Sequence, residues 1–362
     1  MHKRRLPHNP DYNEGTQGMG RKIAVLGSGA IGSSVGADLT RAELDVTIFD
    51  QWPEHVESMK TSGLHIQMMD GDLKIQMRAA HLCELASMKE EFDIIFLVVK
   101  SYDTRWMTEL IKPYLKSDGV LVGVQNSMNN EAIASIVGPE RTVGCVVELS
   151  AEIYTPGLVQ RNTTRKGSWF SVGEIDGSIT PRIEEIRNIM SNVGVTEITT
   201  NISGAKWTKL ISNVMTMGPK GILGYKNDEA HEFPGLLDIQ VNLGKESMTV
   251  GTELGYNIEP IFGLDADDFA GSDDQVLITT LKTLTAHVGI RARTAPIQDF
   301  LKGRKTEMDY INGLVSIRGR EVGVPTPYND AISEISRKIN NGELKMDRSN
   351  YTLLKEMISN TT

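Results

Sequence analysis

The sequence predicts an α/β protein, with a doubly wound parallel sheet followed by a helical second half. Three observations predict it. Short apolar runs alternate with helical stretches up to about residue 200, a glycine-rich turn joins the first run to the first helix, and long helical patterns fill the rest. Strands that alternate with helices are typical of parallel sheets covered on both faces. The 362 residues suffice for two domains of ordinary size, expected at residues 21–200 and 201–362.

In the first half, strands are expected wherever a short apolar run stands between polar turns. These strands are 22–26, 45–49, 92–99, 119–124 and 142–149, with helices at 30–42 and 53–62 between the first of them. Residues 64–68 and 73–77 flank Asp70-Gly71-Asp72, and this spacing predicts a hairpin. Residues 150–200 carry scattered strand and turn signals and complete the first domain.

Helical patterns dominate from about Gly204 onward. Helices are expected at 205–217, 234–254, 273–285, 297–322 and 328–340. An acidic stretch in this half comprises Asp265, Asp267, Asp268, Asp273 and Asp274. Its spacing does not match a calcium-binding loop, and no His or Cys joins it, so we expect a solvated loop and no metal site.

Composition excludes several classes of protein. The formal net charge of −9 argues against general nucleic-acid binding, and no apolar run reaches the roughly 18 residues of a membrane span. Cys83 and Cys145 are too few for a disulfide framework and form no metal motif, so reduced thiols in a cytoplasmic protein are expected. Residues 1–20 are basic and then polar, without the apolar segment of a secretory signal. We expect them to be a disordered extension, with Met19 as a possible start.

A glycine turn, Gly27-Ser28-Gly29-Ala30-Ile31-Gly32, follows the first expected strand and opens the first helix. Gly27 suits a tight turn, Gly29 lets a pyrophosphate approach the backbone, and Gly32 lets the helix pack on the strand. The helix N-terminus offers unpaired N–H groups and a positive dipole end to phosphates. Such a turn also occurs as an ordinary strand–helix connection. Here strand, turn, helix, strand and acid follow in order, which predicts a dinucleotide site.

The acid in this pattern is Asp50, at the end of the second expected strand. A carboxylate there can accept hydrogen bonds from the adenosine ribose hydroxyls, and its charge repels a 2′-phosphate. We therefore expect NAD as the cofactor. NADP is the less favoured alternative, since an Arg or Lys elsewhere can still hold a 2′-phosphate.

Several longer stretches occur together in a characteristic order. They are residues 22–31, Val98-Val99-Lys100-Ser101, Val124-Gln125-Asn126-Ser127-Met128, Trp207-Thr208-Lys209-Leu210-Ile211-Ser212-Asn213, Gly303-Arg304-Lys305-Thr306-Glu307-Met308-Asp309-Tyr310-Ile311-Asn312-Gly313 and Gly323-Val324-Pro325-Thr326-Pro327. On these stretches the chain resembles the ketopantoate reductase (2-dehydropantoate 2-reductase) family, from about residue 21 to residue 340. The WxKLxxN and GRxTExDxxNG patterns are far more specific than the glycine turn.

The resemblance implies a Rossmann N-terminal domain, an all-helical C-terminal domain and an active site in the cleft between them. It implies reduction of a 2-oxo acid to a 2-hydroxy acid with NADPH, although some similar proteins are NAD-dependent 2-hydroxy-acid dehydrogenases. By the same resemblance, Lys209 is the general acid and Glu307 is its acidic companion. Asn213 and Asn227 would touch the substrate, and Lys100 and Asn126 would lie near the nicotinamide and the substrate.

The residue types fit carbonyl chemistry. Hydride transfer to a ketone leaves an alkoxide-like oxygen, which needs a proton donor or a positive charge nearby. Lys209 and Asn213 are four residues apart and share one helix face, so one can hold the reacting oxygen while the other orients the molecule. Glu307, expected in another helix, could orient Lys209 or bind a substrate hydroxyl. The alternatives are a surface lysine and a solvated Glu307 paired with Arg304.

Some positions depart from the family pattern. Met217 stands where a second asparagine is expected one turn after Asn213, and Ala292 and Ala295 stand where Asn and Ser would hold the polar end of the substrate. A pocket without those groups cannot grip a carboxylate and a hydroxyl in the usual way. Thr294, Arg291 or Arg293 can compensate, with Thr294 kept as a substrate-binding candidate. Extra residues at 258–285 could form a lid or an oligomer contact.

We therefore expect an NAD(P)-dependent oxidoreductase that transfers hydride between nicotinamide and a 2-oxo or 2-hydroxy acid in an interdomain cleft. The alternative is an NAD-dependent dehydrogenase of a different hydroxy or sugar acid. A third hypothesis is a nucleotide-binding protein without catalysis, and the set Lys209, Asn213 and Glu307 argues against it. The expected partner is a small carboxylate, without nucleic acid or membrane, and apolar helix faces are compatible with a homodimer.

Overall fold

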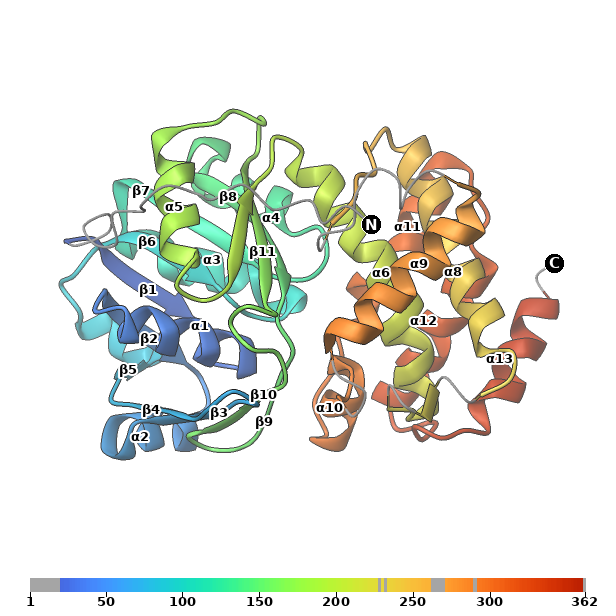
Figure 1. The fold of residues 1–362 in the computed structure, drawn as a ribbon, viewed down its shortest axis with the longest axis horizontal. Coiled ribbons are helices and arrows are strands. Elements are labelled where there is room, and N and C mark those ends of the chain that lie inside the picture. The colour runs from blue at the N-terminus through green and yellow to red at the C-terminus, as the bar shows by residue number, and fades with distance from the viewer. Residues whose placement is uncertain (1–19, 227–228, 231–232, 262–270, 289–291, 361–362) are drawn as a thin grey trace, which may run out of the picture.

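The computed structural model describes residues 20–226, 229–230, 233–261, 271–288 and 292–360. All but the last residue of the predicted N-terminal extension, and the acidic positions Asp265, Asp267 and Asp268, lie outside the described residues. An α/β half and a helical half stand side by side, with α6 (Ile202–Leu223) along their boundary (Figure 1). The predicted fold class is confirmed.

The main sheet has, within the described residues, eight strands in the order β12-β11-β8-β7-β6-β1-β2-β5. Their bounds are β1 Lys22–Leu26, β2 Asp45–Asp50, β5 Arg78–His81, β6 Phe92–Leu97, β7 Leu115–Val124, β8 Thr142–Glu148, β11 Trp169–Glu174 and β12 Val195–Ile198. All neighbours are parallel except β8 and β11, which run antiparallel. The apolar runs that predicted strands are therefore the buried middle of the sheet.

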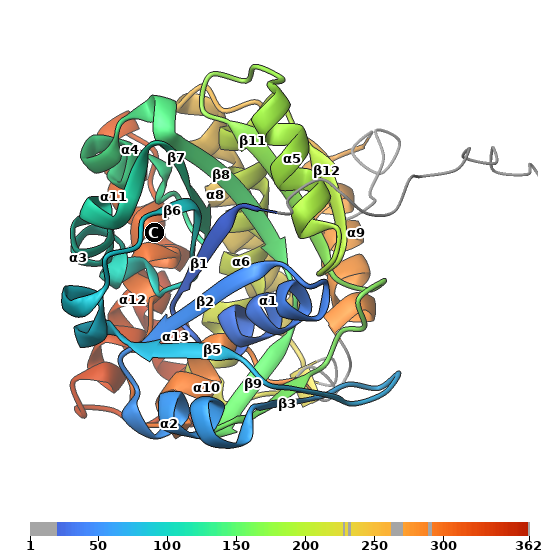
Figure 2. The same ribbon diagram turned by 90° about the vertical axis from the view of Figure 1, so that its left-hand side faces the viewer.

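Helices cover both faces of this sheet, as a doubly wound fold requires. Ile23 and Val25 of β1 belong to one core with α1 (Ala30–Arg41) and α5 (Pro181–Met190), while Ala24 and Leu26 belong to another with α3 (Thr104–Ile111) and α4 (Asn130–Val137). Alternate residues of one strand thus face opposite cores. Figure 2 shows α3 and α4 on one side of the sheet and α1 and α5 on the other.

A second, four-stranded sheet has the order β4-β3-β10-β9. The predicted hairpin is confirmed, because β3 (Leu64–Gln67) and β4 (Leu73–Ile75) pair antiparallel. β10 (Leu158–Arg161) pairs parallel with β3 and antiparallel with β9 (Ala151–Thr155). Part of 150–200 therefore forms a sheet that sequence patterns did not separate from the first. α2 (Pro53–Ser62) leads into this sheet.

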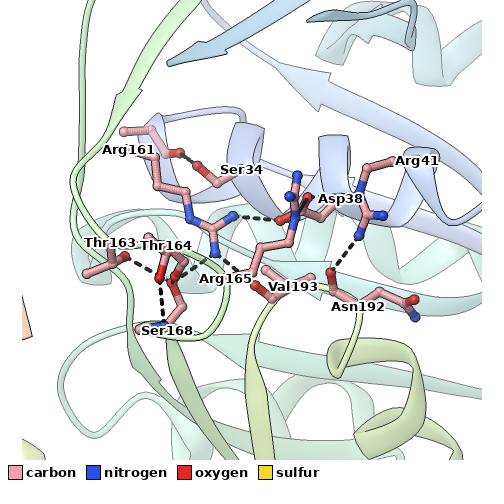
Figure 3. A network of polar contacts seen from close by, with 12 residues as sticks. Ser34, Asp38, Arg41, Arg161, Thr163, Thr164, Arg165, Ser168, Asn192 and Val193 are labelled. Atoms are coloured by element: carbon pink, nitrogen blue, oxygen red, sulfur yellow. Dashed lines mark hydrogen bonds and ion pairs between the residues drawn. The ribbon is translucent and has the colours of Figure 1, made fainter. Parts of the chain in front are cut away.

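A buried ion pair ties the second sheet to α1 (Figure 3). The carboxylate of Asp38 accepts from Arg161 Nη1 and from Arg165 Nε, both at 2.6 Å, and the side chains of Asp38 and Arg161 are fully buried. Arg161 also donates to Ser168 Oγ and to the Val193 carbonyl, each at 2.8 Å. Sequence analysis did not predict this cluster, whose partners are far apart along the chain.

The helical half is built around α6, which packs against α8, α10 and α12. Its other helices are α8 Leu236–Glu253, α9 Asp273–Val288, α10 Ala295–Leu301, α11 Asn312–Val322, α12 Pro327–Asn340 and α13 Asn350–Ser359. The predicted single helix at 297–322 is wrong. α10 ends at Leu301, Gly303 has a φ of 63°, and a 3₁₀ turn at Met308–Tyr310 precedes α11. Among the described helices, none is long and apolar enough to cross a membrane.

Candidate active site

A cavity of about 690 Å³ lies between the carboxyl ends of the sheet strands and the helical half. The segments that follow β1, β2, β6, β7 and β8 form one wall. α6, α10 and residues 302–307 form the other. Doubly wound sheets bind ligands at this edge because their strand ends and helix N-termini meet there. The cavity contains all the described candidate residues.

The glycine turn has the geometry that a dinucleotide needs. Gly27 has a φ of 100°, and a Cβ on it would lie 2.6 Å from the Val98 carbonyl oxygen. A Cβ on Gly32 would lie 1.8 Å from the Gly27 oxygen, so the helix packs there without room for a side chain. A Cβ on Gly29 would meet no atom within 4 Å. Gly29 therefore leaves open space at the N-terminus of α1, where a phosphate can approach the backbone.

Asp50 ends β2 and lines the cavity. One of its carboxylate oxygens accepts from the backbone N–H of Ser28, and the other accepts from the backbone N–H of Trp52 at 2.8 Å. The carboxylate is thus held against the glycine turn, at the place where a ribose hydroxyl would bind in such a site. This arrangement fits a dinucleotide whose adenosine end lies beside Trp52.

His55 supports the same turn from behind, and sequence analysis missed it. The Gly157 backbone N–H donates to His55 Nδ1 at 2.9 Å, so the other ring nitrogen carries the proton and donates to Ser33 Oγ at 3.1 Å. Ser33 Oγ in turn donates to the Ser28 carbonyl at 2.8 Å. Burial lowers the pKa of His55, which keeps the ring neutral and this chain of hydrogen bonds intact.

A basic strap, residues Lys302–Lys305, crosses from the helical half to the aromatic rings of the α/β half. Lys302 Nζ lies 5.4 Å from the ring centre of Tyr154, the Arg304 guanidinium lies 5.1 Å from that of Trp52, and Lys305 Nζ lies 5.6 Å from that of Tyr102. The Tyr102 hydroxyl also donates to the Lys305 carbonyl at 3.1 Å. These cation–π contacts bring positive charge to the cavity wall opposite the glycine turn.

The two candidate residues of α6 lie on one helix face. Lys209 is 8% exposed and Asn213 is 2% exposed, and both line the cavity. Asn213 Nδ2 donates to Asn126 Oδ1 at 3.1 Å, which joins α6 to the loop after β7. Lys209 Nζ forms an ion pair with Glu148 at the end of β8. Sequence analysis missed Glu148, because no spacing along the chain links it to Lys209.

Glu307 lies beside Ser101 and Lys100 at the cavity. The expectation that it lies on a helix is wrong, since it precedes the 3₁₀ turn at Met308–Tyr310. Its carboxylate accepts from Ser101 Oγ at 3.2 Å and lies 3.2 Å from Lys100 Nζ, which also pairs with Asp299 at 2.6 Å. These carboxylates raise the pKa of Lys100 although burial opposes the shift, so Lys100 stays charged.

The remaining candidates lie along the far wall. Thr294 precedes α10 and lines the cavity together with Ala295, Arg293 and Met217, whereas Ala292 is buried outside the lining. Arg293 Nη1 lies 3.6 Å from Glu152. Asn227 and Arg291 fall outside the described residues.

Lys220 also lines this wall and was not predicted. It lies near the end of α6, and burial lowers its pKa to about 8.

Comparisons with known proteins agree with this architecture. Residues 23–177 match the family model described as ketopantoate reductase PanE/ApbA, and residues 201–340 match its C-terminal model. A 2-dehydropantoate 2-reductase of Pyrococcus horikoshii is 29% identical over 85% of this chain and 94% of its own length, and one of Archaeoglobus fulgidus is 26% identical over 89% and 99%.

Solved structures show the same fold. D-mandelate dehydrogenase with NADH and anilino(oxo)acetate has a TM-score of 0.78 at 22% identity, covering 89% of this chain and 99% of that one. A PanE/ApbA family ketopantoate reductase from Ralstonia eutropha JMP134 has a TM-score of 0.75 at 22% identity, with the same coverage of both chains. The two family models together span the cavity lining, the helices packed around α6 and the strands of the main sheet from Ile23 to Glu174, but not β12. The chain therefore belongs to the ketopantoate reductase family of nicotinamide-dependent oxidoreductases.

Proposed function

We propose that this chain transfers hydride between NAD(H) and a 2-oxo or 2-hydroxy acid in the cleft, with Lys209 as proton donor and acceptor. One observation carries the proposal. Lys209 and Asn213 lie on one face of α6 and face the carboxyl end of the sheet, where Asn213 donates to Asn126. Bound nicotinamide would supply or accept the hydride, and the chain's own residues handle the substrate and its proton.

In the reductive direction, the Lys209 ammonium donates its proton to the carbonyl oxygen as that oxygen gains negative charge. In the oxidative direction, the neutral amine removes the hydroxyl proton. The amide groups of Asn213 and Asn126 orient the reacting carbon by hydrogen bonds to the same oxygen or to the carboxylate. Because Lys209 is 8% exposed, water has little access to the proton-transfer step.

The cofactor we favour is NAD. Asp50 presents a carboxylate held by two backbone N–H groups at the adenosine end of the site, and its charge opposes a 2′-phosphate. The geometry of Gly27, Gly29 and Gly32 suits either dinucleotide. Lys100 and Asn126 line the cavity where the nicotinamide would lie, and Glu307 holds Lys100 in place.

Two substrate classes remain candidates. Membership of the family favours ketopantoate as the substrate. Met217 and Ala295, which line the cavity with apolar groups, favour a 2-hydroxy acid with an apolar side chain. D-mandelate dehydrogenase, whose fold is similar, binds the aromatic oxo acid anilino(oxo)acetate. In either case Thr294 and Arg293 offer hydrogen bonds and positive charge to the substrate carboxylate.

We further propose that the boundary between the two domains lies near residue 200 and that the protein is cytoplasmic. We also propose a homodimer formed through the helical half. A dimeric ketopantoate reductase of Staphylococcus aureus with a similar fold supports this by analogy.

The test is a panel of 2-oxo and 2-hydroxy acids assayed with NAD, NADH, NADP and NADPH. We expect turnover with NAD(H) that Lys209→Met abolishes while NADH binding persists. Turnover by Lys209→Met close to that of the parent would refute the assignment of Lys209. Cofactor binding without turnover on any acid would favour a nucleotide-binding protein instead.

A further inference from the structure

We propose that Glu148 is the positioning residue of Lys209 and sets the pH range in which Lys209 transfers its proton. The proposal rests on the role of Lys209 proposed above. Glu148 is the last residue of β8, at the strand ends that form the cavity wall, and its carboxylate forms an ion pair with Lys209 Nζ. The sheet and α6 therefore meet at a charged pair inside the site.

The burial of this pair points to function. The side chains of Lys209 and Glu148 are 10% and 7% exposed, so both charges have lost most of their hydration. A buried ion pair seldom stabilises a fold more than apolar side chains of the same size would. It does fix the positions of its two members, because a charge left alone there would be costly. Glu148 thus holds the ammonium at the cavity wall before substrate arrives.

Glu307 is another carboxylate that lines the cavity, and it contacts Lys100. Its carboxylate accepts from Ser101 Oγ at 3.2 Å and lies 3.2 Å from Lys100 Nζ. Lys209 pairs with Glu148, whereas Lys100 pairs with both Glu307 and Asp299. This separates the tasks: Glu148 acts on the group that moves the proton, and Glu307 acts on the group that lies beside the nicotinamide.

The charge of Glu148 has a defined consequence for the reaction. A carboxylate beside an ammonium favours the protonated form, and removal of the carboxylate charge removes that preference. Reduction needs the ammonium, and oxidation needs the amine. The other charged groups that line the cavity are Asp50, Lys100, Asp103, Lys220, Arg293, Asp299, Lys302, Arg304, Lys305 and Glu307. Lys206 of α6 instead donates to the Gln125 and Cys145 carbonyls.

The experiment compares Glu148→Gln with the parent in pH profiles of kcat and kcat/KM, measured in both directions. In the parent, the rate of reduction should fall and the rate of oxidation should rise at alkaline pH. Removal of the carboxylate charge should move both changes to lower pH together, by about one to three pH units. The KM for NADH should change by less than about twofold, since Glu148 acts through Lys209. Profiles that coincide with those of the parent would overturn the proposal.

Two further variants keep the result interpretable. Glu174→Gln makes the same change at a buried carboxylate of β11 that does not line the cavity. Glu174 pairs with Arg182 at 2.6 Å, and the pH profile of this variant should match that of the parent. Glu148→Asp keeps the charge, so it should retain the parent's pH limbs with a lower kcat, and it replaces Glu148→Gln if that variant does not fold. A limb displaced equally in Glu148→Asp would contradict a role for the charge.

The same assays separate this proposal from the one beneath it. If Lys209→Met remains active, the assignment of Lys209 fails, whatever Glu148 does. If Lys209→Met is inactive and Glu148→Gln behaves as the parent, Lys209 stands and the role of Glu148 is refuted.

Discussion

Gly29 and Gly32 lie three residues apart in one turn, yet alanine should have opposite effects at the two positions. Gly29 has φ −58° and ψ −175°, a conformation open to alanine, and its Cβ would meet no atom within 4 Å. Gly29→Ala should therefore leave stability unchanged or raise it by about 0.4–1 kcal/mol. The Cβ of Gly32→Ala would lie 1.8 Å from the Gly27 oxygen, so the turn must shift. Such overpacking costs about 1–3 kcal/mol or more.

Gly29→Ala should weaken cofactor binding although it leaves the fold stable. The methyl group of Gly29→Ala would occupy the space through which a phosphate reaches the backbone, and one lost hydrogen bond to a charged group costs about 1.5–3 kcal/mol. The Kd for NADH should then rise by about 10- to 100-fold.

Two measurements test this reasoning. They are the apparent Tm without cofactor and the NADH affinity from fluorescence titration. A Gly29→Ala variant that binds NADH within twofold of the parent would refute the proposed phosphate path. A Gly32→Ala variant with an unchanged Tm would refute the packing argument.

Three further predictions concern charged side chains. Asp38→Ala should lower the free energy of unfolding by about 3–5 kcal/mol, because it leaves Arg161 charged and buried; Asp45→Ala, at an exposed ion pair, should change it by less than about 1 kcal/mol in the same urea titration. Arg304→Ala should raise the KM for NADP(H) about tenfold and that for NAD(H) much less, if the guanidinium offers its charge to a 2′-phosphate; an equal rise for both would place it on the pyrophosphate instead. Burial lowers the pKa of Lys206 to about 8, below its unfolded value near 10.5, so the parent should gain stability relative to Lys206→Met as pH rises from 8, by up to about 1.4 kcal/mol per pH unit; parallel curves would contradict this.

Local patterns predicted the elements that depend on local physics. β1 is a short apolar run buried in the sheet, and the hairpin of β3 and β4 follows from the turn at Asp70-Gly71-Asp72. The glycine turn and Asp50 lie together because the ends of neighbouring parallel strands share one edge. These features need only periodicity, turn chemistry and strand order, so the sequence could reveal them.

Contacts between distant segments could not be predicted in this way. Glu148 pairs with Lys209, and Asp38 pairs with Arg161, only because the folded sheet brings β8 to α6 and β10 to α1. The helical pattern at 297–322 also misled, since apolar spacing continues through a segment where Gly303 turns the chain. Glu307 consequently lies in a loop and reaches Lys100.

The face of α6 that lines the cavity is long enough to affect which substrate lengths fit. Lys209, Asn213, Thr216 and Lys220 line the cavity in succession along a single helix. At about 1.5 Å per residue, the backbone of Lys220 lies roughly 16 Å beyond that of Lys209 along the helix axis. With Lys209 as the proposed proton-transfer group, the reacting end of a substrate would lie beside Lys209, and its far end would extend along α6 towards Lys220. On that proposal, substitutions at positions 216–220 would change the preference for longer or shorter acids while Lys209 stays unchanged.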